Sequence, residues 1–238
     1  MKFNSENKNF RSDIETLFNA LKNGERFAFS KYADGEYEIL VNNKITNCDN
    51  WTFEPGKHDY VRSELLKSFQ FNEEGYFVGI SCPCCQPITN VNWMKENVGV
   101  PNERLTWANI FVNSNYQYFL NNFLPEFTKH KIILVANQNA NINNLPFEVE
   151  EHIKISNLAF IDNFNLLDEL SKKEYENKVF LFCAGPLGNM LSAKLWKENK
   201  KNTYIDIGST LNKLLLGGDG NRGYLNGKNN SLSKICKW

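Results

Sequence analysis

The sequence predicts a single α/β domain with a mostly parallel sheet and helices on both faces. Short apolar runs of strand length recur along the chain, and segments with apolar residues at helical spacing separate them. No linker, repeat or low-complexity tract divides the 238 residues, of which 42% are hydrophobic. Strands that alternate with helices form βαβ units with parallel neighbours. We therefore expect one domain over residues 1–238.

The first helix and strand are the clearest elements. Ser12 to Glu15 has the pattern of a capping box, and Gly24 stands where a helix C-cap belongs. Helical spacing of Ile14, Leu17 and Leu21 then predicts a helix over 13–23 and, after it, a strand over 26–32.

The rest of the chain continues the alternation. Asparagine-rich residues 137–146 read as a long loop. Further strands are expected at 76–81, 109–112, 131–136, 152–156, 179–184 and 203–207, and further helices at 59–69, 116–123, 165–170 and 188–198.

Charge and hydropathy exclude two classes of partner. The 27 basic and 27 acidic side chains cancel, which argues against a binder of duplex nucleic acid. Apolar runs such as 132–136 are far shorter than the ~20 residues that cross a bilayer. Six cysteines without a signal peptide indicate reduced thiols. We therefore expect a soluble, cytoplasmic protein.

An acidic pair follows the first strand. Asp34 and Glu36 flank Gly35 at the end of the apolar run 27–29. Ligands of open α/β sheets bind outside the carboxyl ends of the strands, so this D-x-E would hold a divalent cation and a diphosphate. The alternative is a hairpin over 27–41, because Asp-Gly is also a strong hairpin signal.

A glycine turn follows the strand at 179–184. Gly185, Pro186 and Gly188 lead into a helix whose first N–H groups would face an anion. The segment is neither a dinucleotide fingerprint nor a Walker sequence. A compact turn that needs a positive φ explains it equally well.

A third polar edge follows the strand at 203–207. Asp206 interrupts an apolar run beside Gly208 and Ser209. A buried aspartate needs a partner, and this one would be structural, a binder of sugar hydroxyls or a base. The glycine-rich segment 217–224 is either a solvated loop or a lid whose Arg222 meets a phosphate.

The cysteines are clustered. Cys82, Cys84 and Cys85 form a C-x-C-C sequence, which would be part of a zinc site together with Cys48 or His58. The alternative is a rigid turn, set by the two neighbouring prolines, with partly buried thiols.

Three patches in this order resemble the bacterial glycosyltransferases of the GT-D fold: Ser-Lys-Tyr-Ala-Asp-Gly-Glu at 30–36, Ala-Gly-Pro-Leu-Gly at 184–188 and Tyr-Ile-Asp-Ile-Gly-Ser at 204–209. The resemblance implies a Rossmann-like domain that transfers sugar from a nucleotide donor, with the D-x-E pair acting through a metal. Lys31 stands where the family usually has arginine, and Ser209 where many relatives have histidine.

The resemblance also implies roles. The donor would be a nucleotide sugar, most simply a UDP-sugar, and the acceptor would be a glycan or another hydroxyl compound. The activity would be that of a hexosyltransferase, and the cofactor would be Mn²⁺ or Mg²⁺. The alternative is a non-catalytic nucleotide- or glycan-binding protein on the same fold. The expected catalytic residues are Asp34, Glu36 and Asp206, and Asp219 is a second candidate base. Asp34 and Glu36 would also bind the metal. The residues expected to bind the donor are Lys31, Gly35, Gly185, Pro186, Gly188, Gly208, Ser209 and Arg222.

Overall fold

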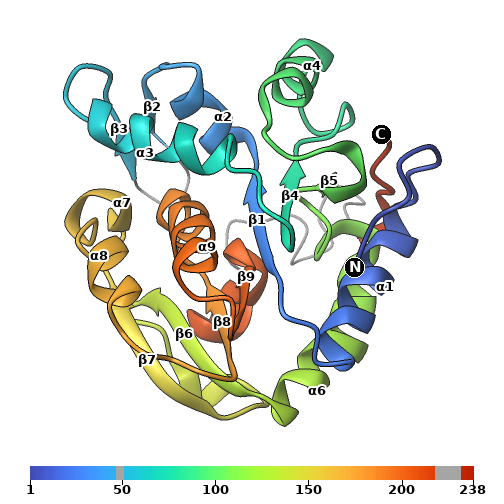
Figure 1. The fold of residues 1–238 in the computed structure, drawn as a ribbon, viewed down its shortest axis with the longest axis vertical. Helices are drawn as coiled ribbons and strands as arrows, with labels where there is room; N and C mark the ends of the chain where they lie inside the picture. The colour runs from blue at the N-terminus through green and yellow to red at the C-terminus, as the bar shows by residue number, and fades with distance from the viewer. Residues whose placement is uncertain (47–50, 218–231) are drawn as a thin grey trace.

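A seven-stranded parallel sheet forms the centre of the computed structural model, which describes residues 1–46, 51–217 and 232–238 (Figure 1). The strand order is β5-β4-β1-β9-β8-β6-β7. The strands are β1 (Ala28–Tyr32), β4 (Tyr76–Ile80), β5 (Leu105–Trp107), β6 (Lys131–Asn137), β7 (Val149–Ile155), β8 (Lys178–Phe182) and β9 (Thr203–Asp206). A short antiparallel pair, β2 (Ile45–Thr46) and β3 (Thr52–Phe53), lies outside it.

Helices cover both faces of the sheet, as the sequence predicts. Alternate side chains of β1 enter two different cores. Ala28 and Tyr32 lie in one, and Phe29 lies in the other together with Phe27, which directly precedes the strand. The first core is covered by α2 (Asp34–Leu40), α3 (Asp59–Phe69), α4 (Ile88–Asn97), α7 (Ala159–Asp162), α8 (Leu166–Ser171) and α9 (Pro186–Glu198). The second is covered by α1 (Phe10–Lys22), α5 (Tyr116–Tyr118), a π-helical turn at Phe119–Phe123, α6 (Leu124–Glu126) and α10 (Asn212–Leu215). Single 3₁₀ turns stand at Asn102–Arg104, Asn113–Asn115, Phe127–Lys129, Ile142–Asn144 and Gly208–Leu211.

The first helix begins earlier than the sequence predicts. The side chain of Asn9 accepts hydrogen bonds from the backbone N–H groups of Arg11 and Ser12, both at 3.0 Å, so Asn9 is the N-cap. Phe10 is buried and packs edge-on against Trp107 with ring centroids 5.4 Å apart. The expected capping box at Ser12 is therefore wrong, because tertiary packing of Phe10 adds another turn.

The expected strand at 109–112 is also wrong. These residues form consecutive turns, in which Ile110 N donates to Trp107 O at 3.2 Å and Val112 N to Asn109 O at 3.1 Å. The strand of this region is β5, directly before them. Ile110 and Phe111 are apolar because they are buried in the second core, not because they pair in the sheet.

Other expected elements match the structure closely. The helix over 59–69 has the predicted ends, and residues 116–123 are helical throughout, as α5 and the π turn. The hairpin alternative for 27–41 is excluded, because β1 is followed directly by α2.

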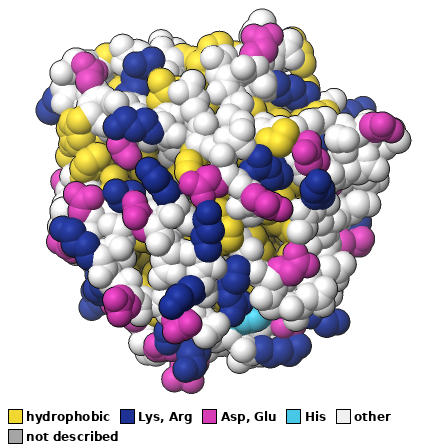
Figure 2. Space-filling view, in the orientation of Figure 1, with side chains coloured by type: hydrophobic (Ala, Val, Ile, Leu, Met, Phe, Trp, Pro, Cys, Tyr) yellow, Lys and Arg dark blue, Asp and Glu magenta, His cyan; other side chains and the backbone are white. Residues whose placement is uncertain are grey.

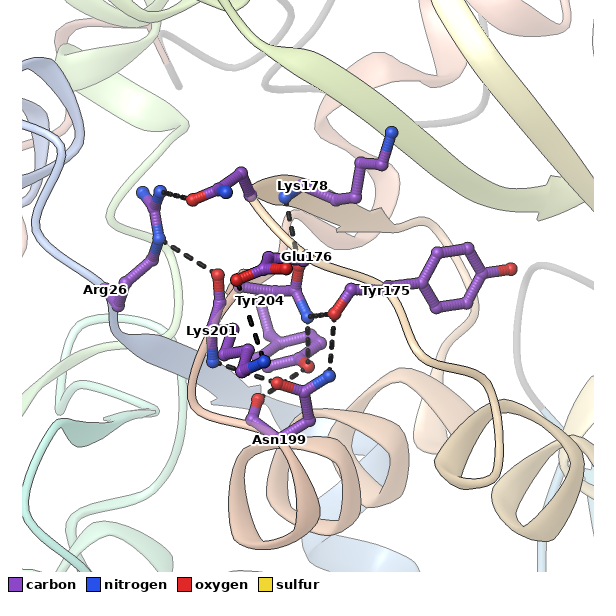
Figure 3. A network of polar contacts seen from close by, with 9 residues as sticks. Arg26, Tyr175, Glu176, Lys178, Asn199, Lys201 and Tyr204 are labelled. Atoms are coloured by element: carbon purple, nitrogen blue, oxygen red, sulfur yellow. Dashed lines mark hydrogen bonds and ion pairs between the residues drawn. The ribbon is translucent and has the colours of Figure 1, made fainter.

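A polar network closes the amino-terminal edge of the sheet (Figure 3). Arg26, before β1, donates to Lys201 O at 3.1 Å and to Asn177 Oδ1 at 2.7 Å. Tyr175 O accepts from the side chain of Asn199 at 2.8 Å, and further bonds from Asn202 and Tyr204 join the same loops. These contacts tie the loops before β1, β8 and β9 together, at the end of the sheet opposite to the D-x-E pair.

The surface and the helix lengths agree with the composition. Basic and acidic side chains are interspersed over the face shown in Figure 2. Among the residues that the structure describes, no helix is both long and apolar enough to cross a membrane.

Candidate functional site

The carboxyl ends of β1 and β9 form the point where the chain changes face. The two strands are neighbours, with Ala28 opposite Tyr204 and Phe29 opposite Ile205. After β1 the chain passes to the face that α2 covers, and after β9 to the opposite face, where α10 lies. Connections that diverge in this way leave a crevice in which open α/β sheets bind ligands. The structure thus brings the first and third polar edges of the sequence together.

Asp206 is the buried centre of this edge. Its side chain is 2% exposed, and its Oδ2 accepts from Lys31 N at 3.0 Å, while its Oδ1 accepts from Gly208 N at 3.0 Å. Burial raises the pKa of Asp206 to about 6, although the Lys31 ammonium and the two backbone N–H groups lower it. The carboxylate therefore fastens the end of β1 to the turn after β9.

Asn189 of α9 completes this arrangement and was missed by the sequence reasoning. It is fully buried, and its Nδ2 donates to Ser30 Oγ at 3.1 Å, to Asp206 Oδ2 at 3.3 Å and to Lys31 O. Its Oδ1 has no hydrogen-bond partner among the described residues. The sequence contains a feature that could have identified it, because Asn189 is an amide among apolar residues of a predicted helix. A buried amide needs hydrogen-bond partners.

Asp34 and Glu36 lie in the first turn of α2. Asp34 is exposed, whereas Glu36 is partly buried and its Oε2 accepts from Ala33 N at 2.9 Å, which satisfies one N–H of the helix start. Burial raises the pKa of Glu36 to about 7, and the nearby carboxylates of Asp206 and Asp34 raise it further.

Asp34 and Glu36 carry the kind of donor atom that a divalent cation prefers. Mg²⁺ and Mn²⁺ bind oxygen ligands, and these two carboxylates both stand in the first turn of α2. The pKa of Glu36 is raised first by burial and then by repulsion from the carboxylates of Asp206 and Asp34. A bound dication would relieve that repulsion. Asp206 fits a ligand role less well, because both of its oxygens already accept N–H groups.

Lys31 crosses the turn after β9. Gly208 has φ +53°, and a Cβ at this position would lie 2.5 Å from Lys31 Nζ. A larger residue would therefore collide with the lysine as well as strain the backbone. The ammonium lies near enough to Asp206 to lower the pKa of its carboxyl. Ser209 follows in the 3₁₀ turn Gly208–Leu211.

The glycine turn before α9 reaches the same edge. Gly185 has φ +53° and precedes Pro186 at the first position of the helix. At Gly188 a Cβ would lie 3.1 Å from Phe182 Cβ and 3.5 Å from Asp206 Oδ1, so this glycine lets α9 approach β8 and β9 closely. Gly35 is buried in the first turn of α2. Arg222 and Asp219 lie outside the described residues.

Two tryptophans, Trp51 and Trp107, are packed inside the protein and are not exposed platforms on which a sugar ring could stack. Trp51 is 5% exposed and packs against Phe160 with centroids 5.3 Å apart, and Trp107 is 1% exposed. The Trp51 indole nitrogen lies 3.8 Å from where a Cβ on Gly185 would stand. Trp51 thus packs beside the glycine turn.

Comparisons with known proteins identify the fold. No protein-family model and no curated protein matches the chain. A solved structure described as "The highly conserved domain of unknown function 1792 has a distinct glycosyltransferase fold" is 13% identical, with a TM-score of 0.56 over 83% of this chain and 77% of that one. "A New Glycosyltransferase (DUF1792) from Streptococcus sanguinis" is 12% identical, with a TM-score of 0.57 over 84% and 80%. The chain therefore has this glycosyltransferase fold, as its resemblance to the GT-D proteins implied.

Proposed function

We propose that this protein is a glycosyltransferase that moves a sugar, most simply a hexose, from a nucleoside diphosphate donor to a hydroxyl of a glycan acceptor. One observation carries the proposal: in a glycosyltransferase fold, Asp34, Glu36, Asp206 and Lys31 converge where β1 and β9 end. A UDP-sugar is the donor we would test first, and the cytoplasm is the expected compartment.

Asp34 and Glu36 are the proposed metal ligands. A bound Mn²⁺ or Mg²⁺ would act as a Lewis acid on the diphosphate that leaves when the bond to the sugar breaks. Burial and the neighbouring carboxylates raise the pKa of Glu36 to about 7, so a bound cation would have to displace a proton from it near neutral pH. Asp34, exposed beside it, supplies the second carboxylate.

Lys31 and the glycine turns are proposed to bind the donor. The Lys31 ammonium would pair with a phosphate oxygen, as a point charge without the two-point geometry of arginine. N–H groups at the start of α9, beside Gly185 and Pro186, would face the nucleotide or the sugar. Gly208 leaves room for Lys31 beside the backbone, because Lys31 Nζ lies 2.5 Å from where a Cβ would stand.

Asp206 is proposed as a positioning residue. Its hydrogen bonds with Lys31 N and Gly208 N set the relative position of the two strand ends. The side chain of Asn189 donates to Lys31 O at the end of β1 and to Asp206 at the end of β9. A role as the base that deprotonates the acceptor would require Asp206 to release N–H partners that it already has. The arrangement therefore favours binding and orientation over proton transfer at this carboxyl.

The test begins with ligand binding, because no acceptor is needed. Nucleoside diphosphates and nucleotide sugars are added with Mn²⁺, with Mg²⁺ or without added metal, and the thermal midpoint is recorded. Ligand binding to the native state raises the midpoint. We expect one nucleotide to stabilise the protein only when a divalent ion is present. Hydrolysis of the same nucleotide sugar is then followed by release of the diphosphate.

Variants of Asp34 and Glu36 distinguish a role in binding metal from a role in capping the start of α2. Asp34→Asn and Glu36→Gln should each lower turnover ~100-fold or more, since several kcal/mol of charge stabilisation are lost. Glu38→Gln is the matched control, because Glu38 lies in the same helix and accepts from Asn43 Nδ2 at 2.8 Å instead of facing the crevice. Wild-type turnover in Asp34→Asn or Glu36→Gln would refute the metal role. Binding without any hydrolysis would favour the non-catalytic alternative.

A further inference from the structure

Four cysteine sulfurs gather beyond the carboxyl end of β4, and none of the carboxylates described above is among them. Cys82, Cys84 and Cys85 follow β4, and Cys236 comes from the C-terminal tail. Their Sγ atoms all lie within 4.8 Å of one another. Cys82 and Cys236 are buried, at 2% and 3% exposure. We propose that these four thiolates bind a structural zinc ion that fixes the tail to the end of β4.

The turn after β4 directs three sulfurs to one point. Cys85 N and Gln86 N both donate to Cys82 O, at 2.9 and 3.0 Å, which closes a tight turn around Pro83. Cys82 Sγ lies 2.9 Å from Cys84 Sγ, and Cys84 Sγ lies 4.0 Å from Cys85 Sγ. Tetrahedral zinc with Zn–S bonds of about 2.3 Å places its sulfurs roughly 3.8 Å apart. The observed separations bracket that value.

The C-terminal tail delivers the fourth sulfur. Ser114 N donates to Lys234 O at 3.0 Å, and Trp107 Nε1 donates to Lys237 O at 3.1 Å. Trp238 packs edge-on against Trp107 with centroids 5.2 Å apart. Cys236 is therefore held between two backbone anchors. The tail thus places the buried thiol of Cys236 beside the buried thiol of Cys82.

Polar groups around the sulfurs suit thiolates. Asn109 Nδ2 donates to Cys85 Sγ at 3.2 Å and Asn113 Nδ2 to Cys236 Sγ at 3.3 Å. Asn113 is 5% exposed and has φ +54°, a conformation that few residues other than glycine adopt. The Lys234 ammonium donates to Cys84 O beside the cluster. N–H donors and a cation of this kind orient metal ligands and offset the negative charge of a zinc tetrathiolate.

Other uses of the cluster fit less well. A disulfide needs sulfurs about 2.05 Å apart, and the five cysteines that the structure describes are all free. An iron–sulfur cluster needs space for several irons between its cysteines, whereas these sulfurs surround room for one ion. Zinc binds more tightly than Fe²⁺ to a given site. Four protein ligands leave no open position, so the site is structural.

The structure changes the ligand set that the sequence suggested. The fourth ligand was expected at Cys48 or His58. His58 instead stands at the start of α3, where its Nδ1 accepts from Glu54 N at 3.1 Å, and Cys48 lies outside the described residues. Cys236 takes the position.

The test is the metal content of the full chain. Protein purified without chelators from a zinc-supplemented culture is analysed by plasma mass spectrometry, and about one zinc ion per chain is expected. A mercurial reagent that blocks thiols should release this zinc to a metallochromic dye. Cys236→Ser should lose most of the zinc and melt at a lower temperature. Cys183→Ser is the matched control and should retain it, because Cys183 is outside the cluster.

Every outcome decides the proposal. Wild-type protein that contains almost no zinc, or iron in its place, overturns it, and so does full zinc content in Cys236→Ser. If that variant does not fold, Co²⁺ added to metal-depleted wild type gives a second readout, because tetrahedral cobalt thiolate has characteristic visible absorption. A colourless cobalt sample would also overturn the proposal. None of these readouts depends on sugar transfer.

Discussion

Replacing Asn189 with alanine tests whether one buried amide joins the strand ends at the crevice. The wild-type amide donates to Ser30, Lys31 and Asp206 from a fully buried position in α9. The alanine variant leaves a buried carbonyl and a buried carboxylate with one donor fewer and creates a small cavity. Each lost donor costs about 1–2 kcal/mol, so we expect the free energy of unfolding to fall by about 2–4 kcal/mol. For a chain of this length, that lowers the thermal midpoint by ~5–15 °C.

The control is Ser192→Ala in the same helix. Ser192 is equally buried, but its Oγ donates to Gly188 O at 2.8 Å, within α9 itself. Its loss should cost less than about 1 kcal/mol, because the helix backbone stays intact. Urea unfolding followed by tryptophan fluorescence measures both variants, as the chain has five tryptophans. If Asn189→Ala lies within about 0.5 kcal/mol of Ser192→Ala, the cross-strand bonds do not stabilise the site as argued.

Two further predictions concern the protonation of buried Asp13 and the lack of a side chain at Gly208. Burial raises the pKa of Asp13 to about 6, so the native state binds its proton more tightly than the unfolded chain does. The free energy of unfolding should therefore fall by ~3 kcal/mol as pH rises from about 3 to 7. Asp13→Asn should remove this part of the slope in urea titrations at several pH values; equal slopes in variant and wild type would contradict it. Gly208→Ala should displace Lys31 and strain the turn by ~1–3 kcal/mol, and weaken nucleotide binding about tenfold or more. Calorimetric titration with the stabilising nucleotide checks this, and unchanged affinity would argue against Lys31 as a phosphate ligand.

Local elements were largely predictable because their causes are local. The helix α3 has apolar residues at helical spacing, and its ends match those predicted. Gly185 before α9 and Pro186 at its first position also indicate a turn and a helix start. The pattern failed at 109–112, where residues are apolar because a core covers them, and it failed at Ser12, where packing of Phe10 extends the helix. Burial is a tertiary property, so apolar character alone does not distinguish a strand from a buried turn.

The sequence by itself determined that an acidic pair ends a buried strand, that an aspartate ends another and that three cysteines share one turn. Only the tertiary structure decided which of these meet. Lys31 and Asp206 are 175 residues apart, yet they share a hydrogen bond because β1 and β9 are neighbours in the sheet. Cys236 likewise joins a turn that follows β4. Strand order depends on how all the helices pack over both faces of the sheet, and no local pattern of residues encodes that packing.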